Sequence, residues 1–249
     1  MIHVEKLNKS FNGKKIISNI SLSIQPGKIT SIIGPSGGGK TTFLKCLSML
    51  APPDTGTIKV DDQVYVFPND TRIRNAPPWP KLNVVFQQLF LWPHLTLRQN
   101  IFLPLQLQSK AMKDYEIERR KSRAEKLIEE LSLQDAIDRF PNETSLGQRQ
   151  RAAIIRALAL EPSYLLLDEV TSALDIEHIG IVLNTLKEAS SDGMGILLVT
   201  HLLKFAMNSS DHIVFLEDGI IYEQGKPDII RNPHSERLRE FLSLIKVVS

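Results

Sequence analysis

Gly34-Pro-Ser-Gly-Gly-Gly-Lys40-Thr41 is the stretch of sequence from which the rest of the chain can be interpreted. It fits the phosphate-loop pattern, with Gly34, Gly39, Lys40 and Thr41 at the fixed positions. Glycine lets the backbone turn tightly and brings successive N–H groups close to a polyphosphate. The lysine supplies a charge for the outer phosphates, and the threonine offers a hydroxyl to Mg²⁺. The stretch therefore predicts a nucleotide site with a magnesium ion.

The residues on either side of the loop support this interpretation. Lys28–Ile33 is typical of a strand, and Thr41–Met49 is typical of a helix whose N-terminal dipole would favour phosphate. The alternative is a glycine-rich turn that matches by accident, which average residue usage allows in on the order of one per cent of chains this long. The expected nucleotide contacts are Gly34, Pro35, Ser36, Gly37, Gly38, Gly39, Lys40, Thr41 and Thr42.

Composition narrows the class of protein. The chain has 249 residues, 42% of them hydrophobic, which suits one large domain or two small ones. A net charge of +2 with mixed signs is unlike the basic footprint of a nucleic-acid binder. The sequence has no apolar run long enough for a membrane span and no apolar signal core at its start. The single Cys46 cannot form an internal disulfide, and a reducing cytosol is the expected compartment.

Strand-like and helical stretches alternate along most of the chain, which favours a mostly parallel sheet with helices on its faces. Asn12-Gly13 between two β-prone stretches predicts a hairpin. Between about residues 96 and 160 the sequence is mainly helical, which indicates an insertion into the α/β core rather than one crossover. The predicted strands are 2–7, 20–24, 28–33, a pair within 56–66, 82–86, 164–167, 196–200 and 213–216. The predicted helices are 41–49, 113–131, 145–160 and 177–189.

An apolar strand that ends in two carboxylates forms the second motif, Tyr164-Leu-Leu-Leu-Asp168-Glu169. In a parallel sheet the carboxyl end of a strand faces the ligand crevice. Asp168 can hold the metal ion that bridges the β- and γ-phosphates, and Glu169 can orient or deprotonate the attacking water. Alone, the pattern is equally well explained by a solvated strand end, but the phosphate loop upstream favours the functional interpretation.

Further motifs follow in an order that resembles the ATP-binding cassette of ABC transporters, from one end of the chain to the other. The phosphate loop is followed by a Q-loop-like Val85-Phe86-Gln87, a signature-like Ser145-Leu-Gly-Gln148, the Asp168-Glu169 pair, a D-loop-like Ser172-Ala-Leu-Asp175 and the switch-like His201. The resemblance implies a P-loop NTPase core of the RecA-like kind, with an antiparallel β subdomain and an inserted helical subdomain. It implies one domain over 1–249, with the nucleotide-binding core in 1–94 and 160–249 and the helical subdomain in 95–159.

The resemblance also implies residue roles and ligands. Phe11 would stack on the adenine of ATP, and Gln87 would contact the metal and water and sense a transmembrane partner. Glu169 would position the water, and His201 would hold it and the γ-phosphate. Considered singly, Phe11 is more often a core residue and His201 a structural histidine, so the joint order of the motifs carries the assignment. The implied set is catalytic Glu169, His201 and Gln87, with Thr41, Gln87 and Asp168 on Mg²⁺.

A second copy of the chain is implied by the signature. In the family two cassettes pair head to tail on ATP, so that Ser145, Gly147 and Gln148 of one copy close over the nucleotide of the other, with Asp175 in the D-loop beside them. The signature normally has glycine where Leu146 stands. Glycine allows close backbone approach and φ values that leucine avoids, so leucine should weaken the pairing. Because Ser145 and Gly147 remain, we expect pairing to survive in this weakened form.

The subfamily is suggested by the stretches Gly193–His201 and Gly219–Gly225, which look like polar amino-acid importers. This implies membrane permease subunits on other chains, a periplasmic or surface solute-binding protein, no nucleic acid, and a peripheral position on the cytoplasmic face of the inner membrane. Trp92 falls where the family receives a coupling helix, although burial within the cassette is an equal alternative. A cassette for lipid, lipoprotein or efflux transport, a non-transport cassette and a weakly active regulatory cassette are the other candidate functions.

Overall fold

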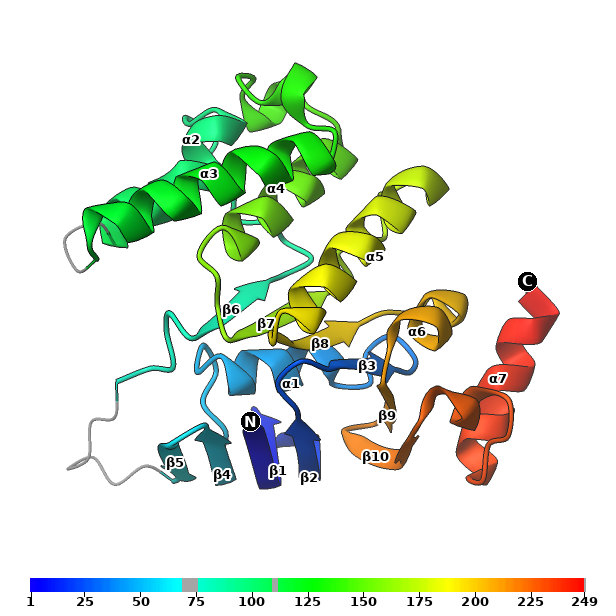
Figure 1. Ribbon diagram of the computed structural model, residues 1–249. Coiled ribbons are helices and arrows are strands. Elements are labelled where there is room, and N and C mark those ends of the chain that lie inside the picture. Colours follow the sequence, from blue (N-terminus) through cyan, green and yellow to red (C-terminus); the bar gives the residue numbers. More distant parts are fainter. Residues whose placement is uncertain (69–75, 109–111, 249) are drawn as a thin grey trace.

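Two β-sheets with helices between and around them make up the computed structural model, which describes residues 1–68, 76–108 and 112–248 (Figure 1). The smaller sheet is antiparallel and has the order β2-β1-β4-β5. The larger sheet has the order β10-β9-β3-β8-β7-β6, and all its neighbouring pairs are parallel except β10 with β9. The predicted α/β class is therefore confirmed.

The elements occupy the following ranges. The strands are β1 (Ile2–Phe11), β2 (Lys14–Ile24), β3 (Ile29–Ile33), β4 (Thr55–Val60), β5 (Gln63–Phe67), β6 (Leu82–Val85), β7 (Tyr164–Asp168), β8 (Gly195–Val199), β9 (His212–Glu217) and β10 (Ile220–Gly225). The helices are α1 (Lys40–Leu47), α2 (Leu97–Gln108), α3 (Asp114–Glu130), α4 (Leu146–Leu158), α5 (Ile176–Ser191), α6 (Leu203–Ser209) and α7 (Glu236–Val248), with short 3-10 turns η2 (Gln134–Ala136), η3 (Pro141–Glu143) and η4 (Pro227–Ile230).

The hairpin predicted at Asn12-Gly13 is present, and both residues have positive φ, 50° and 77°. This is the backbone of a type I′ turn, which Asn-Gly favours. Strands β1 and β2 run further toward this turn than the predicted 2–7 and 20–24. Their pairing shifts register three times between Val4 and Ser10, so the polar–apolar alternation is interrupted there although the strands continue.

Helix α1 lies between the two sheets (Figure 1). Its buried residues Phe43, Leu44, Cys46 and Leu47 join a core built from the inner faces of β1, β2, β4 and β7–β9. Cys46 thus packs as a small apolar residue, and burial raises the pKa of its thiol to about 12. The loop that precedes the helix is held against the larger sheet, because the N–H of Gly219, just after β9, donates to the carbonyl of Gly38 at 3.0 Å.

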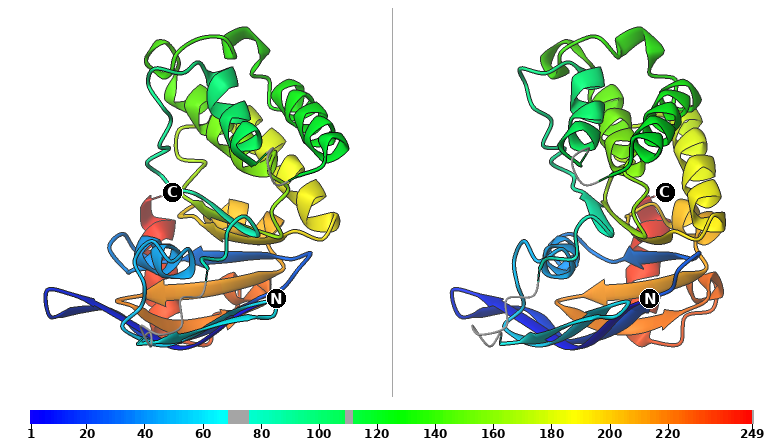
Figure 2. Two further views of the ribbon diagram at one scale, coloured as in Figure 1. Left: turned by 90° about the vertical axis from the view of Figure 1, so that its left-hand side faces the viewer. Right: turned by 60° about the vertical axis from the view of Figure 1, so that its left-hand side comes forward.

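Helices α2, α3 and α4 gather beyond the other face of the larger sheet, with α5 beside them (Figure 2). They share one apolar core with the outer faces of β7 and β8. Pro104 lies inside α2, and this helix was not predicted individually because its sequence mixes that breaker with few charges. Where the helical subdomain begins and ends, at 95 and 159, stays a prediction.

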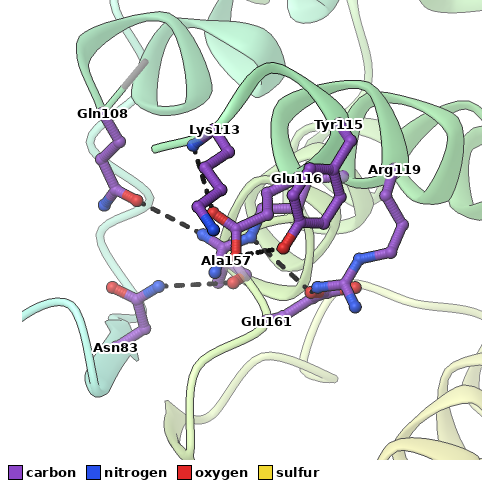
Figure 3. A network of polar contacts seen from close by, with 9 residues as sticks. Asn83, Gln108, Lys113, Tyr115, Glu116, Arg119, Ala157 and Glu161 are labelled. Atoms are coloured by element: carbon purple, nitrogen blue, oxygen red, sulfur yellow. Dashed lines mark hydrogen bonds and ion pairs between the residues drawn. The ribbon is translucent and has the colours of Figure 1, made fainter. Parts of the chain in front are cut away.

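Polar contacts connect α3 to the segment between α4 and β7 (Figure 3). Arg119 hydrogen-bonds Glu161, and the Nε of Arg120 lies 3.6 Å from the same carboxylate. The Asn83 amide on β6 donates to the carbonyl of Ala157 at 3.3 Å. These contacts place the helical block against the core at the edge of the sheet.

In the described ranges, no helix combines the length and apolarity that a membrane span needs.

Candidate functional site

The predicted site residues follow the carboxyl ends of four strands in the larger sheet. The phosphate loop follows β3, Gln87 follows β6, Asp168 and Glu169 end β7, and His201 follows β8. Because these strands are parallel neighbours, the four segments meet at one edge. Topology alone therefore brings together residues that are up to 167 positions apart in the sequence (from Gly34 to His201).

A cavity of about 470 Å³ opens at this edge. Its walls come from the β1–β2 hairpin, the phosphate loop, the start of α1 and the ends of β6 and β7. A larger cavity, of about 610 Å³, lies near Tyr164 and Gly193 at the amino ends of the strands, where the structure places no phosphate loop. The residues that line the smaller cavity are Phe11, Ile16, Ser36, Gly37, Gly39, Lys40, Thr41, Thr42, Gln87 and Glu169.

The phosphate loop requires glycine at Gly34, where the backbone has φ +147° and a Cβ would lie 1.9 Å from the carbonyl oxygen of Leu216. Gly37 and Gly39 have φ of +79° and +96° in the same loop. Gly39 immediately precedes α1, so the loop leads directly into a helix N-terminus. The loop thus has the tight geometry that its sequence predicts.

Two buried ionisable side chains, Lys40 of the loop and Asp168 at the end of β7, lie at this site. The Nζ of Lys40 donates to the carbonyls of Gly34 at 3.0 Å and Pro35 at 2.7 Å. Burial lowers the pKa of Lys40, although the carboxylates of Glu169 and Asp168 oppose that shift. Burial raises the pKa of Asp168, a shift that a hydrogen bond with Thr41 opposes. Both side chains are therefore desolvated charges that a ligand of opposite charge would stabilise.

The donors near Thr41 suit a magnesium ion. The Thr41 side chain and the carboxylate of Asp168 are within hydrogen-bonding contact. A hydroxyl and a carboxylate are oxygen ligands of the kind Mg²⁺ prefers, and a divalent cation would compensate the buried negative charge. Gln87 lines the same cavity and adds an amide oxygen within it. The residues present therefore fit the ion that the sequence predicts.

Glu169 has an unusual backbone conformation, with φ of 51°. Its N–H donates to the carbonyl of Val199 at 3.0 Å, which ties the residue to strand β8. A non-glycine residue held at positive φ costs on the order of 1 kcal/mol, and such strain is concentrated at functional sites. The Nδ1 of His201 lies 3.9 Å from the Glu169 carboxylate. The two predicted catalytic groups are therefore neighbours across the ends of β7 and β8.

The hairpin contributes the aromatic wall of the cavity. Phe11 is the last residue of β1, and 45% of it is exposed. This excludes a core role for Phe11 and leaves its ring accessible to a base. Ile16, the third residue of β2, lies beside it and was not predicted, because an isoleucine in a strand carries no signal that separates cavity lining from core.

The signature residues lie elsewhere, at the start of α4. Ser145 caps this helix: its Oγ accepts from the N–H of Gln148 at 3.1 Å, and the Gln148 amide oxygen accepts from the N–H of Ser145 at 2.9 Å. Neither these two residues nor Gly147 lines the 470 Å³ cavity. The structure thus separates the signature from the phosphate loop within one chain.

The signature contacts the D-loop of the same chain. A Cβ on Gly147 would lie 3.0 Å from the carbonyl oxygen of Ala173. The side chain of Gln150 donates to Ser172 Oγ and accepts from the N–H of Ala173, both at 3.3 Å. Asp175 caps α5 by accepting from the N–H of His178, and this hydrogen bond lowers the pKa of its carboxyl. Gln150 lies just after the signature stretch in the sequence, but its contact with the D-loop was not predicted.

Leu146 corrects one expectation from the sequence. It is the first residue of α4 and does not have the positive φ that leucine avoids. The φ argument against leucine at this position is therefore wrong for the single chain, while the effect of leucine on close approach to a partner stays a prediction. The side chain is 47% exposed, so it lies on the surface beside Ser145.

Trp92 is 51% exposed, which rules out its burial within the cassette. Its backbone is fixed all the same, because the buried Asn100 accepts from its N–H and donates to its carbonyl. Phe90, two residues earlier, is also exposed, at 61%. The segment after Gln87 therefore presents aromatic side chains on a held backbone.

Comparison with known proteins matches residues 17–172 to the ABC transporter family. The chain is 39% identical to the arginine transport ATP-binding protein ArtM of Bacillus subtilis, over 98% of this chain and 100% of the relative. It is 37% identical to the glutamine transport ATP-binding protein GlnQ of Escherichia coli, over 97% and 98%. Among solved structures, it resembles the dimeric ATP-binding cassette MJ0796 bound to ADP and Pi, with a TM-score of 0.78 and 32% identity over 91% of this chain and 99% of that one.

These similarities extend over nearly the whole chain and include both the phosphate loop and the Asp168-Glu169 pair. They confirm the P-loop NTPase fold, and they agree with a cavity built for a nucleotide polyphosphate. The chain belongs to the ABC transporter family, as an ATP-binding subunit that hydrolyses ATP.

Proposed function

We propose that this ATPase drives the import of a small polar solute, an amino acid, through membrane subunits carried on other chains. The observation that supports the ATPase site is the cavity that gathers Phe11, the phosphate loop, Gln87 and Glu169. The names of the similar proteins, which transport arginine, cystine or glutamine, support the choice of cargo. They favour it over the lipid, lipoprotein and efflux alternatives.

Within the cavity each residue has a distinct role. Loop N–H groups and Lys40 bind the β- and γ-phosphates, while Phe11 takes the adenine. Thr41, Asp168 and Gln87 would hold Mg²⁺, which supplies positive charge for the phosphate oxygens. Phosphoryl transfer depends mainly on positioning and charge stabilisation, so few protein groups are needed.

Glu169 and His201 act on the water. The Glu169 carboxylate accepts a hydrogen bond from the attacking water and orients it toward the γ-phosphorus. His201, 3.9 Å away, holds that water and the γ-phosphate from the neighbouring strand end. The backbone hydrogen bond from Glu169 to Val199 fixes the carboxylate against β8, so water and histidine keep one relative position.

The signature acts in a second copy. Because Ser145, Gly147 and Gln148 lie outside the cavity of their own chain, we propose a head-to-tail pair in which they close over the partner's nucleotide. The dimeric state of the cassette MJ0796 supports a pair. The exposed Phe90 and Trp92 would contact the permease at the cytoplasmic face of the membrane, and a solute-binding protein would deliver the cargo outside.

Glu169→Gln tests the site. This variant keeps the shape of the residue and removes the carboxylate, so we expect ATP hydrolysis to fall by on the order of a hundredfold or more. ATP binding should persist, and light scattering should detect a dimer that needs ATP. Glu188→Gln, on the exposed face of α5, is the matched control. A Glu169→Gln protein that hydrolyses ATP at the wild-type rate would contradict the assignment.

The cargo needs its own experiment. The chain is co-expressed with the membrane subunits that co-purify with it and reconstituted in proteoliposomes with ATP on the cassette side. Uptake of amino acids, and none of lipid or sugar, is the expected result. Movement of substrate toward the cassette-distal side would instead identify an exporter.

A further inference from the structure

Phe11 has a cation on one face. The Nζ of Lys9 lies over the Phe11 ring, 5.1 Å from its centroid. At this distance an ammonium group is attracted by the π electrons of the ring. Lys9 itself is not among the residues that line the nucleotide cavity, whereas Phe11 is. The ring is therefore held by the cation from outside the cavity and stays accessible within it.

The position of this cation is fixed by other groups. Lys9 Nζ donates to the Asp54 carboxylate at 3.0 Å and to the Pro52 carbonyl at 2.7 Å. The second carboxylate oxygen of Asp54 accepts from the N–H of Ser10 at 2.6 Å. Burial opposes ionisation of Asp54, but the hydrogen bonds from Lys9 and Ser10 prevail and lower the pKa of its carboxyl. Only 15% of the Lys9 side chain is exposed, which is little for a lysine.

These contacts connect the aromatic wall to the phosphate-binding helix. Pro52 and Asp54 lie between α1 and β4, and the turn after α1 is closed by a hydrogen bond from the N–H of Ala51 to the carbonyl of Lys45. The N–H of Asp54 in turn donates to the carbonyl of Asn8 on β1 at 2.8 Å. The phosphate loop therefore precedes α1, and the segment that follows α1 carries Pro52 and Asp54, which fix Lys9.

We propose that Lys9, fixed by Asp54, is a positioning residue that orders the Phe11 ring for stacking on the nucleotide base and sets its distance from the phosphate loop. The inference rests on the proposed role of Phe11. A ring at the end of a hairpin beside a turn loses rotamer freedom when a base stacks on it, and a ring already fixed loses less. Lys9 thus contributes to the binding of the base and leaves the binding of the phosphates unchanged.

The test compares ATP with inorganic tripolyphosphate, which has the phosphates and lacks the base. Dissociation constants with Mg²⁺ are measured by calorimetry for the wild type, Lys9→Met and Lys9→Arg. Lys9→Met keeps the length of the side chain and removes the charge. The Phe11 ring then has more rotamer freedom to lose, so ATP binding should weaken about three- to fivefold, near the low end of the cost of immobilising one side chain. Tripolyphosphate binding should not change, and Lys9→Arg should keep the affinity for ATP.

Equal weakening of both ligands would overturn the proposal, because it would mean that Lys9 supports the loop or the phosphates. Unchanged ATP binding in Lys9→Met would overturn it as well. Asp54→Asn gives a second test. Lys9 then loses the carboxylate that fixes it, so ATP binding should weaken while tripolyphosphate binding stays the same.

Phe11→Ala separates this inference from the function on which it rests. If Phe11→Ala leaves the preference for ATP over tripolyphosphate unchanged, the proposed base platform itself is wrong. If Phe11→Ala lowers that preference and Lys9→Met does not, only the role of Lys9 is wrong. When both lower it, Lys9→Met should have no further effect in the Phe11→Ala background, because the lysine then has no ring to order.

Discussion

The two halves of the proposed ATPase site are built by different means. The phosphate loop is fixed by backbone contacts: Gly34 has no space for a Cβ beside Leu216, and the loop lies against buried side chains at the sheet edge. The signature is a capped helix end on the surface, where Ser145 and Gln148 bond each other and Leu146 is exposed. One half is rigid within a single chain, and in the proposed pair the other half contacts a partner.

This difference explains where sequence variation is tolerated. A substitution in the phosphate loop must fit an existing backbone, so its cost is set within the chain. A substitution at the signature changes an exposed surface that, in the proposed pair, becomes buried only when a second copy arrives. The following changes should have large effects in the first half and small effects in the second, and any reversal of that order would break the comparison.

Asp168→Asn should have the largest effect on activity. It removes the buried carboxylate that we assign to Mg²⁺, and ATP hydrolysis should fall by on the order of a hundredfold or more. Steady-state phosphate release at saturating Mg²⁺ measures this. Asp211→Asn, which changes a carboxylate that pairs with Lys28 and does not line the nucleotide cavity, is the control.

Asp168→Asn should also stabilise the nucleotide-free protein against unfolding. The pKa of Asp168 is raised in the fold, mainly by burial, so the folded state binds a proton more tightly than the unfolded chain. The protonated carboxyl is neutral and costs much less in desolvation than the carboxylate. Stability therefore falls as pH rises from the unfolded pKa, about 3.9, through the folded one. Asp168→Asn should therefore melt at a higher temperature than the wild type at pH 7, with a difference that shrinks toward pH 4. Equal melting temperatures at pH 7 would contradict this.

Gly34→Ala should come next, through its effect on the fold of the loop. The added Cβ meets a backbone oxygen at 1.9 Å, so strand β3 or the end of β9 must move. We expect a loss of more than about 3 kcal/mol in the free energy of unfolding, together with loss of ATP binding. Gly37→Ala is the matched control: its φ is positive but its Cβ meets open space, so it should cost only about 1–2 kcal/mol. Urea titration of both variants separates the clash from the φ penalty.

The rigid half was also the half that sequence could predict. Glycine spacing, strand and helix flanks and the carboxylates of Asp168-Glu169 all depend on local backbone geometry, which short motifs encode. The hairpin at Asn12-Gly13 was found for the same reason. The approach of Gln87 and His201 to the loop was implied only by the resemblance to the family, and the shared edge of the parallel strands gives the physical reason for it.

The parts that sequence could not predict depend on long-range contacts. Lys9 and Phe11 are neighbours on β1, but Asp54 reaches Lys9 only because the segment after α1 packs beside that strand. Gln150 contacts Ser172 and Ala173 of the D-loop, 22 and 23 positions further along the chain, and nothing in a helix-spaced glutamine indicates these contacts. Leu146 was misjudged because a motif shows which residue is usual and does not show which backbone angle the position has.

Gly147→Ala should have a moderate effect, and it tests the link between the signature and the D-loop. Its Cβ would meet the Ala173 carbonyl at 3.0 Å, so the D-loop must yield by a few tenths of an ångström. Fold stability should change by less than about 1 kcal/mol, since alanine is also the better helix former, while ATPase activity falls several-fold. Gly180→Ala on α5 has open space and should only stabilise. A Gly147→Ala protein with unchanged activity would mean that the D-loop absorbs the shift without consequence for the pair.

Leu146 should have the smallest effect and gives the sharpest comparison. If only the size of leucine hinders the approach of the partner, Leu146→Ala and Leu146→Gly should raise ATPase activity alike, by about twofold, when the membrane subunits are present. If the position needs glycine for its backbone, Leu146→Gly alone should raise it. The helical backbone at Leu146 in the single chain predicts the first result. An increase with Leu146→Gly alone would show that the signature changes its backbone when two copies close. Leucine would then fit this position only in the unpaired chain.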